Sequence, residues 1–276
     1  MKRKISAVLL LACSIFLLNG CKKKHEEVDL SSIHTTAARE TMAPTTAKEE
    51  ETTTVPETEE TTKASDDASQ ISSRTLSYHP QDNANITISY PEISNMNDSG
   101  KQEQVNKLLM ENASALYASM EADGSLESME IKCNVEALDR NRATVVYTGS
   151  YKLKDGPYPV SVFFTNTVDL QQVKSLGIND YSDAYTMAGY LMSDDVQFYQ
   201  VNDSLKNSLL EYRATQTIED YTNLFNQADF PLKASDGTAV FPESFSYLNQ
   251  STLYFSIPVP HALGDYAIVS FPMDGK

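Results

Sequence analysis

A stretch rich in threonine and glutamate limits where this chain can fold. Residues 34–63 include runs such as Glu49–Thr54 and Glu57–Thr62 and hold few large apolar side chains. Such a segment cannot bury enough apolar surface to offset the loss of conformational entropy, so we expect it to stay disordered. The sequence therefore predicts a flexible stalk over residues 21–74 and a globular region over residues 75–276, long enough for one large domain or two small ones.

Residues 1–20 have the pattern of a secretion signal. Three cations at residues 2–4 precede an almost unbroken apolar run from Ile5 to Leu18, which is shorter than the roughly twenty apolar residues of a membrane-spanning helix. The run ends in Leu18–Cys21, which resembles the lipobox of bacterial lipoproteins. This resemblance implies that the sulfur of Cys21 receives a diacylglycerol and that the chain is cleaved before it.

The residues after the cysteine favour a lipid anchor over the alternative, an ordinary secretory signal. Lys22–Lys24 follow Cys21 directly, and basic residues beside anionic headgroups reinforce the hold of acyl chains on a membrane. We therefore expect a lipid-anchored protein on the extracytoplasmic side of a bacterial cell membrane.

The globular region is strongly acidic in its own right. Residues 75–276 contain 12 lysines and arginines against 26 aspartates and glutamates, a net charge of −14. A surface of this kind repels nucleic acid and favours cationic partners through long-range attraction. The alternative is that the charge only keeps a secreted protein soluble.

Apolar spacing predicts an α+β fold. Alternation predicts strands over residues 86–90, 129–138, 142–153, 158–170, 253–257 and 266–272. Helical spacing begins at Ser99, the predicted N-cap, and ends at Gly124; it returns over residues 182–193, 203–214 and 217–228, where Thr217 is the predicted N-cap. Two successive blocks of strands and helices predict two small sheet-plus-helix units, residues 75–170 and 171–276, packed as one globular region.

Cys133 is the only cysteine of the globular region, so no intramolecular disulfide is expected there. It follows Met129 and Ile131 at alternate positions and precedes Val135, which predicts that all four share the apolar face of a strand. A buried and inert thiol is the favoured interpretation over a nucleophile.

Short motifs spread over residues 84–272 resemble a tandem pair of domains of unknown function. The matching segments are Tyr90–Ile93, Val105–Asn106, Thr167–Leu170, Leu176–Asp180, Phe241–Pro242, Leu253–Phe255 and Pro260–Tyr266. In the family, this pair forms the extracellular part of lysozyme-sensing anti-sigma factors, and its first domain also occurs beside peptidoglycan deacetylase domains. The resemblance implies an α+β fold that binds a lysozyme-like protein.

The chain departs from that family at two turns. Asp155–Pro159 stands where many members have a glycine-rich turn with a histidine, and Gln171–Lys174 stands where members have Thr-Gly-Lys. A spanning helix, a cytoplasmic portion and a deacetylase domain are not evident in the sequence. For these reasons no binding residue is transferred from the family.

No motif in the globular region predicts catalysis, a cofactor or a metal site. Its two histidines, His79 and His261, lie near opposite ends, and the sequence lacks nucleophile, phosphate-loop and zinc-protease motifs. His261 in its loop, Tyr181 and Tyr185 are the candidate ligand-binding residues, because tyrosines provide contact area at low entropic cost. Core packing is the alternative role for each tyrosine.

We therefore expect a non-catalytic surface lipoprotein with a binding or sensing module. The favoured partner is lysozyme or another cationic protein, and the alternative partner is cell-wall glycan (peptidoglycan). Less favoured are a cell-wall hydrolytic enzyme, since paired carboxylates could assemble in space, and a transporter's solute receptor, for which the chain is short.

Overall fold

The computed structural model describes residues 70–276 except residues 82, 122–123, 236–237 and 274–276. The predicted signal, Cys21 and nearly all of the predicted stalk lie outside the described residues. The described part belongs to one compact unit, Lys63–Lys276. It contains helices with antiparallel and mixed sheets, so the predicted α+β class is confirmed.

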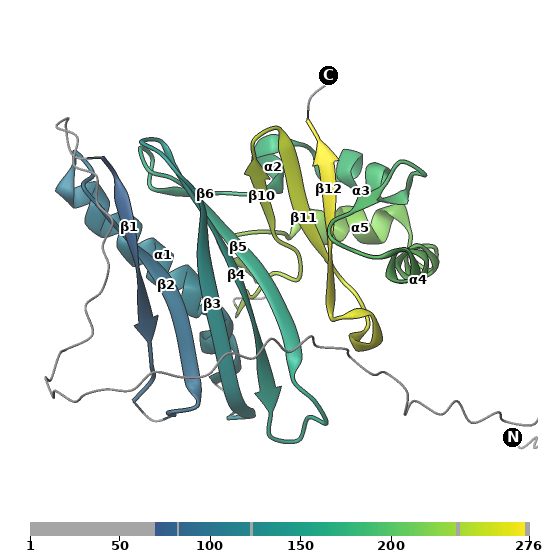
Figure 1. The fold of residues 1–276 in the computed structure, drawn as a ribbon, viewed down its shortest axis with the longest axis horizontal. Helices are drawn as coiled ribbons and strands as arrows, with labels where there is room; N and C mark the ends of the chain where they lie inside the picture. The colour runs from purple at the N-terminus through teal and green to yellow at the C-terminus, as the bar shows by residue number, and fades with distance from the viewer. Residues whose placement is uncertain (1–69, 82, 122–123, 236–237, 274–276) are drawn as a thin grey trace, which may run out of the picture. The chain divides into compact units, whose positions relative to one another are not determined.

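A six-stranded sheet makes up the first half of the fold (Figure 1). In spatial order its strands are β1 (Ser72–Tyr78), β2 (Ile86–Ser94), β3 (Leu126–Leu138), β4 (Arg142–Leu153), β5 (Val160–Asp169) and β6 (Lys174–Leu176). Neighbours are antiparallel except β2 and β3, which are parallel because helix α1 (Ser99–Glu121) crosses over between them. β1 was not predicted, and it begins inside the last residues of the predicted stalk.

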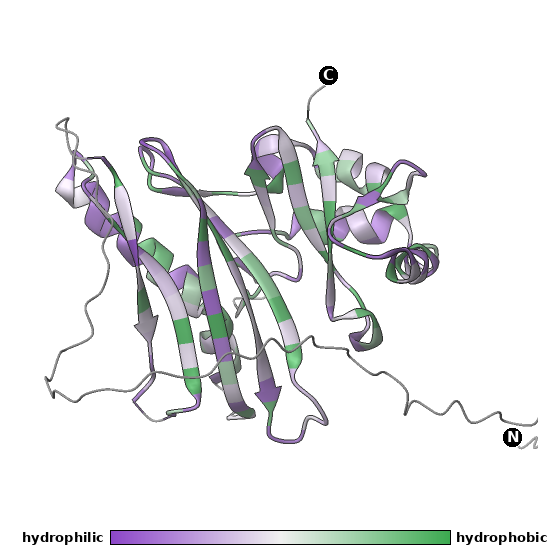
Figure 2. Cartoon of the chain, in the orientation of Figure 1, coloured by the Kyte–Doolittle hydropathy of each residue, from purple (hydrophilic) through white to green (hydrophobic). Residues whose placement is uncertain are grey.

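Strand alternation explains how this sheet buries its residues. Along β3, Met129 and Ile131 are buried and the intervening charged positions are exposed, as the alternating colours in Figure 2 show. Cys133 continues the apolar face and lies opposite the fully buried Tyr147 of β4. The predicted facing of Cys133 is confirmed, although the side chain is only half-buried. Burial raises the pKa of its thiol, which lowers the reactive thiolate fraction.

Helix α1 covers one face of the first sheet. Its buried residues include Val105, Leu109 and Leu116, which join the strand residues in one hydrophobic cluster. The predicted N-cap, Ser99, was wrong by one position. Asp98 caps the helix instead, because its Oδ1 accepts a hydrogen bond from the backbone N–H of Lys101 at 3.0 Å.

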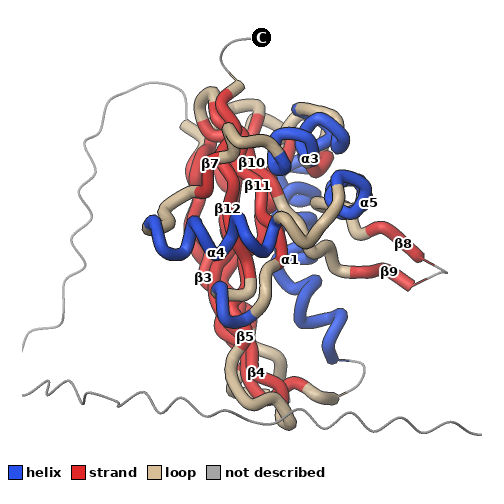
Figure 3. Tube along the Cα trace, turned by 90° about the vertical axis from the view of Figure 1, so that its right-hand side faces the viewer, coloured by secondary structure: helices blue, strands red, loops and turns tan. Residues whose placement is uncertain are grey.

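The second sheet is smaller and has helices against it. Its strands in spatial order are β10 (Ser246–Asn249), β11 (Thr252–Pro258), β12 (Tyr266–Pro272) and β7 (Gln197–Phe198). The helices are α2 (Ile178–Tyr181), α3 (Ala184–Met192), α4 (Asp203–Arg213) and α5 (Ile218–Asn226). α3 and α5 pack against each other (Figure 3), and Phe225 of α5 meets Phe255 of β11 edge-on at 5.2 Å. Thr217 caps α5 as predicted, with Asp220 completing a capping box.

Several short strands and one 3-10 turn were not predicted from the sequence. A separate hairpin pairs β8 (Lys233–Ser235) with β9 (Thr238–Val240), and a 3-10 turn, η1 (His261–Leu263), joins β11 to β12. Strands of two to four residues are too short to show an alternating pattern. None of the described helices is both long enough and apolar enough to cross a lipid bilayer.

Hydrogen bonds and aromatic contacts join the two sheets. Thr165 Oγ1 of β5 donates to the carbonyl oxygen of Ser246 at 2.6 Å, and Asn249 Nδ2 donates to Glu136 Oε1 at 2.6 Å. Phe245 packs against Phe164 of β5, with ring centroids 5.9 Å apart. The apolar cluster beneath α1 therefore continues into the second half of the chain.

A buried carboxylate ties loops of the second half together. Asp229 is 3% exposed and accepts three hydrogen bonds, from the backbone N–H of Ile178 at 2.7 Å, the backbone N–H of Ser246 at 2.6 Å and Ser246 Oγ at 2.8 Å. A Cβ on Gly177 would lie 2.6 Å from the Cβ of Asp229. The loop can approach this closely because residue 177 lacks a side chain.

Candidate functional site

The structure places the β4–β5 turn of the first sheet against the β11–β12 connection of the second sheet. In Figure 1, the β4–β5 turn and the β11–β12 connection lie at the lower ends of their sheets. Tyr158 lies in the β4–β5 turn and His261 lies in η1. Their rings stack, with centroids 4.4 Å apart and planes 2° apart. Tyr158 is 54% exposed and the His261 side chain is 47% exposed, so the pair presents aromatic surface to solvent.

Asp265 holds this aromatic pair in position. Its Oδ1 lies 2.8 Å from His261 Nδ1, and its Oδ2 accepts a hydrogen bond from the backbone N–H of Ser161 at 2.7 Å. Burial alone would raise the pKa of Asp265, but the hydrogen bonds from Ser161 and His261 and the charge of His261 hold it below its ordinary value. A carboxylate that stays ionised anchors the imidazole and joins β5 to the last loop.

This arrangement, the Tyr158–His261 corner, has the properties of a protein-binding anchor. Its rings need little further ordering on binding because stacking and the Asp265 contact already orient them. Aromatic side chains at the centre of an interface commonly carry a large share of the binding energy.

The other two candidate residues lie elsewhere. Tyr181 ends α2 and its hydroxyl is inside the protein; burial raises its pKa, and the nearby Arg142 guanidinium acts in the opposite direction. Tyr185, in the first turn of α3, is 65% exposed and lines a shallow apolar pocket with Ile218. α2 and α3 lie toward the end of the second sheet opposite η1 (Figure 1). The structure therefore does not bring His261, Tyr181 and Tyr185 together.

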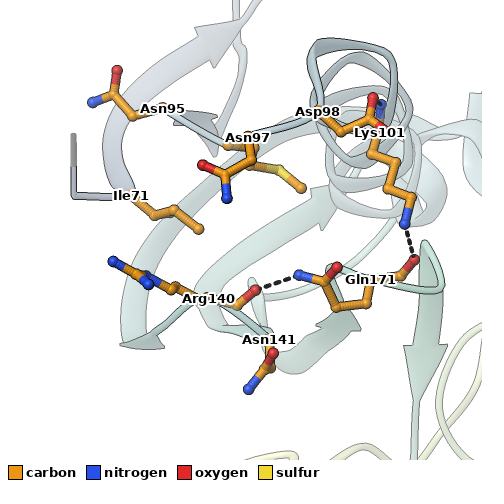
Figure 4. A pocket seen from close by; sticks show the side chains of 9 residues that line it. Ile71, Asn95, Asn97, Asp98, Lys101, Arg140, Asn141 and Gln171 are labelled. Atoms are coloured by element: carbon orange, nitrogen blue, oxygen red, sulfur yellow. Dashed lines mark hydrogen bonds between the residues drawn. The ribbon is translucent and has the colours of Figure 1, made fainter. Parts of the chain in front are cut away.

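A polar pocket of about 550 Å³ lies at the other end of the first sheet (Figure 4). It forms where the β2–α1 loop, the β3–β4 turn and the β5–β6 turn meet. Its lining residues are Ile71, Asn95, Met96, Asn97, Asp98, Lys101, Arg140, Asn141 and Gln171. We call it the amide pocket, because four of its nine side chains are asparagine or glutamine.

Hydrogen bonds fix the walls of the amide pocket. Gln171 Nε2 donates to the carbonyl oxygen of Arg140 at 2.7 Å, and Lys101 Nζ donates to the carbonyl oxygen of Gln171 at 2.7 Å. Asn95 has a positive φ of 65° and donates to the carbonyl oxygen of Gln70 and to Ser72 Oγ. These bonds join loops far apart in the sequence, so the pocket is formed before any ligand binds.

Among the residues that the structure describes, no group of three or more histidine, cysteine, aspartate or glutamate side chains is placed to hold a metal ion.

Comparisons with known proteins found similar solved structures. No protein-family model matches the sequence, and no curated protein matches it. One solved structure, a member of the DUF3298 family from Bacteroides fragilis NCTC 9343, is 14% identical; the match covers 74% of this chain and 90% of that chain, with a TM-score of 0.35. A DUF3298 family protein from Pseudomonas aeruginosa PAO1 is 10% identical; the match covers 74% and 92%, with a TM-score of 0.35.

Both are DUF3298 family proteins. That designation is consistent with a domain of unknown function and specifies no ligand. The predicted link to lysozyme-sensing ectodomains therefore stays a prediction.

Sequence reasoning missed residues whose roles depend on contacts between distant segments. Tyr158 was noted only as part of a divergent turn, and Asp265 only as part of a loop motif. The spacing of His261 and Asp265, four residues apart across a turn, was the one local signal for their contact. Lys101 and Arg140 gave no signal, because they converge only when three loops meet.

Proposed function

We propose that this chain is a lipid-anchored, non-catalytic surface protein whose α+β module binds a cationic protein such as a lysozyme. The observation that supports this most directly is the Tyr158–His261 corner, a pre-oriented and exposed aromatic pair on a unit of strongly negative charge. The resemblance to lysozyme-sensing ectodomains suggests the same class of partner.

Two physical effects divide the work of binding in this proposal. The net charge of −14 attracts a basic partner and raises the association rate, an effect that fades as salt shortens the screening length from about 8 Å at physiological ionic strength. The aromatic pair supplies short-range contact, which acts mainly on the dissociation rate. Salt and mutation therefore change different rate constants.

Surface plasmon resonance with immobilised lysozyme and the full chain in detergent tests the proposal. We expect Tyr158→Ala to weaken binding about 10-fold to 100-fold, mainly through faster dissociation, because about 1.4–2.7 kcal/mol is usual for an exposed aromatic anchor. Raising the salt concentration should slow the association of lysozyme with both the wild type and the Tyr158→Ala variant. Tyr185→Ala is the matched control, since Tyr185 is also an exposed tyrosine but lies at the opposite end of the second sheet.

Three outcomes would count against this proposal. One is the absence of binding at micromolar concentration, and another is equal binding to an unrelated protein of similar basic charge. The third is a larger loss from Tyr185→Ala than from Tyr158→Ala, which would move the binding surface to the α3–α5 pocket.

The lipid anchor has its own test. Changing Cys21→Ala removes the sulfur that would carry the diacylglycerol, so we expect the variant to leave the membrane fraction or to remain unprocessed. Metabolic labelling with a palmitate analogue should mark the wild-type chain and not the variant. Equal labelling of both would disprove lipidation at Cys21.

A further inference from the structure

Some lysines and arginines of this acidic unit form ion pairs with carboxylates, and others do not. Five pair with carboxylates: Arg74 with Glu92, Lys107 with Glu111, Lys132 with Glu130, Lys152 with Glu127 and Lys174 with Asp180. Within the described part of the chain, the other lysines and arginines form no such pair, and two of these unpaired cations, Lys101 and Arg140, line the amide pocket. Two cations thus face one cavity in a unit that has carboxylates in excess.

The pocket also retains unused hydrogen-bonding groups. In the described residues, the Arg140 guanidinium and the side-chain amides of Asn97 and Asn141 have no hydrogen bond within the protein, while the backbone around them is pinned. Lys101 Nζ donates once, to Gln171, and has two further protons. A ligand can therefore use these groups without breaking an existing bond.

Asp98 is the one carboxylate among the lining residues, and one of its oxygens already accepts a hydrogen bond from the backbone. This oxygen, Oδ1, accepts the bond from the backbone N–H of Lys101 and caps α1. In Figure 4 the Arg140 guanidinium lies on the far side of the pocket from Asp98 and Lys101. A ligand carboxylate can thus meet Arg140 without lying against Asp98.

Two apolar side chains complete the lining. Ile71 and Met96 are partly buried against the core and present hydrocarbon to the same cavity. Apolar wall, amide donors and acceptors, and a planar guanidinium together suit a sugar, whose C–H face is apolar and whose rim carries hydroxyl groups. A volume of about 550 Å³ is within the usual range of small-molecule pockets.

We infer that the amide pocket binds a carboxylated sugar, with Arg140 contacting its carboxylate and Asn97, Asn141 and Lys101 contacting its polar rim. This site is separate from the proposed protein-binding corner. β5 runs from the Tyr158 turn at one end of the first sheet to the Gln171 turn at the other, so each site can be tested alone.

Binding is measured by isothermal titration calorimetry on the full chain in detergent, with two matched pairs of probes. N-acetylmuramic acid and glucuronic acid carry a carboxylate, whereas N-acetylglucosamine and glucose are their uncharged counterparts. We expect both acids to bind more tightly than their counterparts. A stronger response to N-acetylmuramic acid would identify an acetamido sugar as the source.

Variants separate the pocket from general electrostatics. Arg140→Gln should weaken binding of the acids at least about 10-fold, in keeping with loss of a charged hydrogen bond, while Asn97→Ala should weaken acids and neutral sugars alike. Lys206→Gln removes one exposed cation on α4, away from the pocket. It should change neither the binding of the acids nor the binding of the neutral sugars. We expect the variants to fold because the altered side chains are exposed. Thermal unfolding of each variant verifies this.

The inference is overturned if neither acid binds at about 10 mM, or if lactate binds as well as N-acetylmuramic acid. It is equally overturned if Arg140→Gln and Lys206→Gln have the same effect. Failure of this experiment leaves the lysozyme experiment unaffected, because neither Tyr158 nor His261 lines the pocket.

Discussion

Replacing Asp229 by alanine is expected to lower the free energy of unfolding by about 3–5 kcal/mol, because three buried donors lose their acceptor at once. The donors belong to Ile178 and Ser246, so the loss would loosen the loop before α2 and the start of β10 together. Residue 229 also has a φ of 61°, a conformation that aspartate and asparagine tolerate better than alanine. Urea denaturation followed by circular dichroism measures the effect.

Asp229→Asn separates charge from hydrogen bonding. Asparagine keeps one acceptor oxygen and tolerates the positive φ, so we expect a smaller loss than for alanine. A loss below about 1 kcal/mol for alanine would show that the carboxylate is not a main tie between these loops.

The same residue predicts a pH dependence. Burial raises the pKa of Asp229 to about 6 from an ordinary 3.8, although hydrogen bonds from Ile178 and Ser246 and the charge of Lys233 act to lower it. Because the folded pKa is the higher one, the stabilising contribution is complete below about pH 4 and is lost as the pH rises through about 6. Between pH 4 and pH 7 the wild type should therefore lose up to about 3 kcal/mol relative to Asp229→Asn. Equal pH profiles for the two proteins would contradict the raised pKa.

Gly149→Ala is expected to destabilise the protein by about 3 kcal/mol, although alanine usually suits a strand better than glycine. Gly149 of β4 pairs with Ile131 of the antiparallel neighbour β3. An added Cβ at Gly149 would overlap the carbonyl oxygen of Glu130. The obstacle is backbone, so the two strands would have to separate locally. Thermal and urea unfolding of the variant measure the effect.

Gly189→Ala is the matched control for this substitution. Gly189 is inside α3, and nothing lies within 4 Å of the position that its Cβ would take. Alanine should therefore stabilise the helix by about 0.5–1 kcal/mol. If both substitutions changed stability in the same direction, the close approach of β3 and β4 would not explain the effect at Gly149.

Local chemistry made several features predictable. The α+β class, the facing of Cys133 and the capping of α5 by Thr217 all follow from interactions within a few residues, and the structure confirms them. The predicted cap of α1 failed by one position because Asp98 and Ser99 are both good capping residues and stand side by side.

Sheet pairing was beyond local reasoning. Nothing in Ser72–Tyr78 specifies that it forms the edge beside β2, and the parallel pairing of β2 with β3 depends on how α1 packs across the sheet. Such pairings are chosen by burial of the whole core and not by the alternation of any one strand.

The binding surfaces divide in the same way. The sequence by itself determined that the unit is acidic and that His261 lies in a loop, because charge and turn residues can be counted directly. Only the tertiary structure decided that Tyr158 stacks on His261, and that Lys101 and Arg140 line one pocket. The members of each set come from segments far apart in the sequence, and packing of the two sheets and α1 places them around one site.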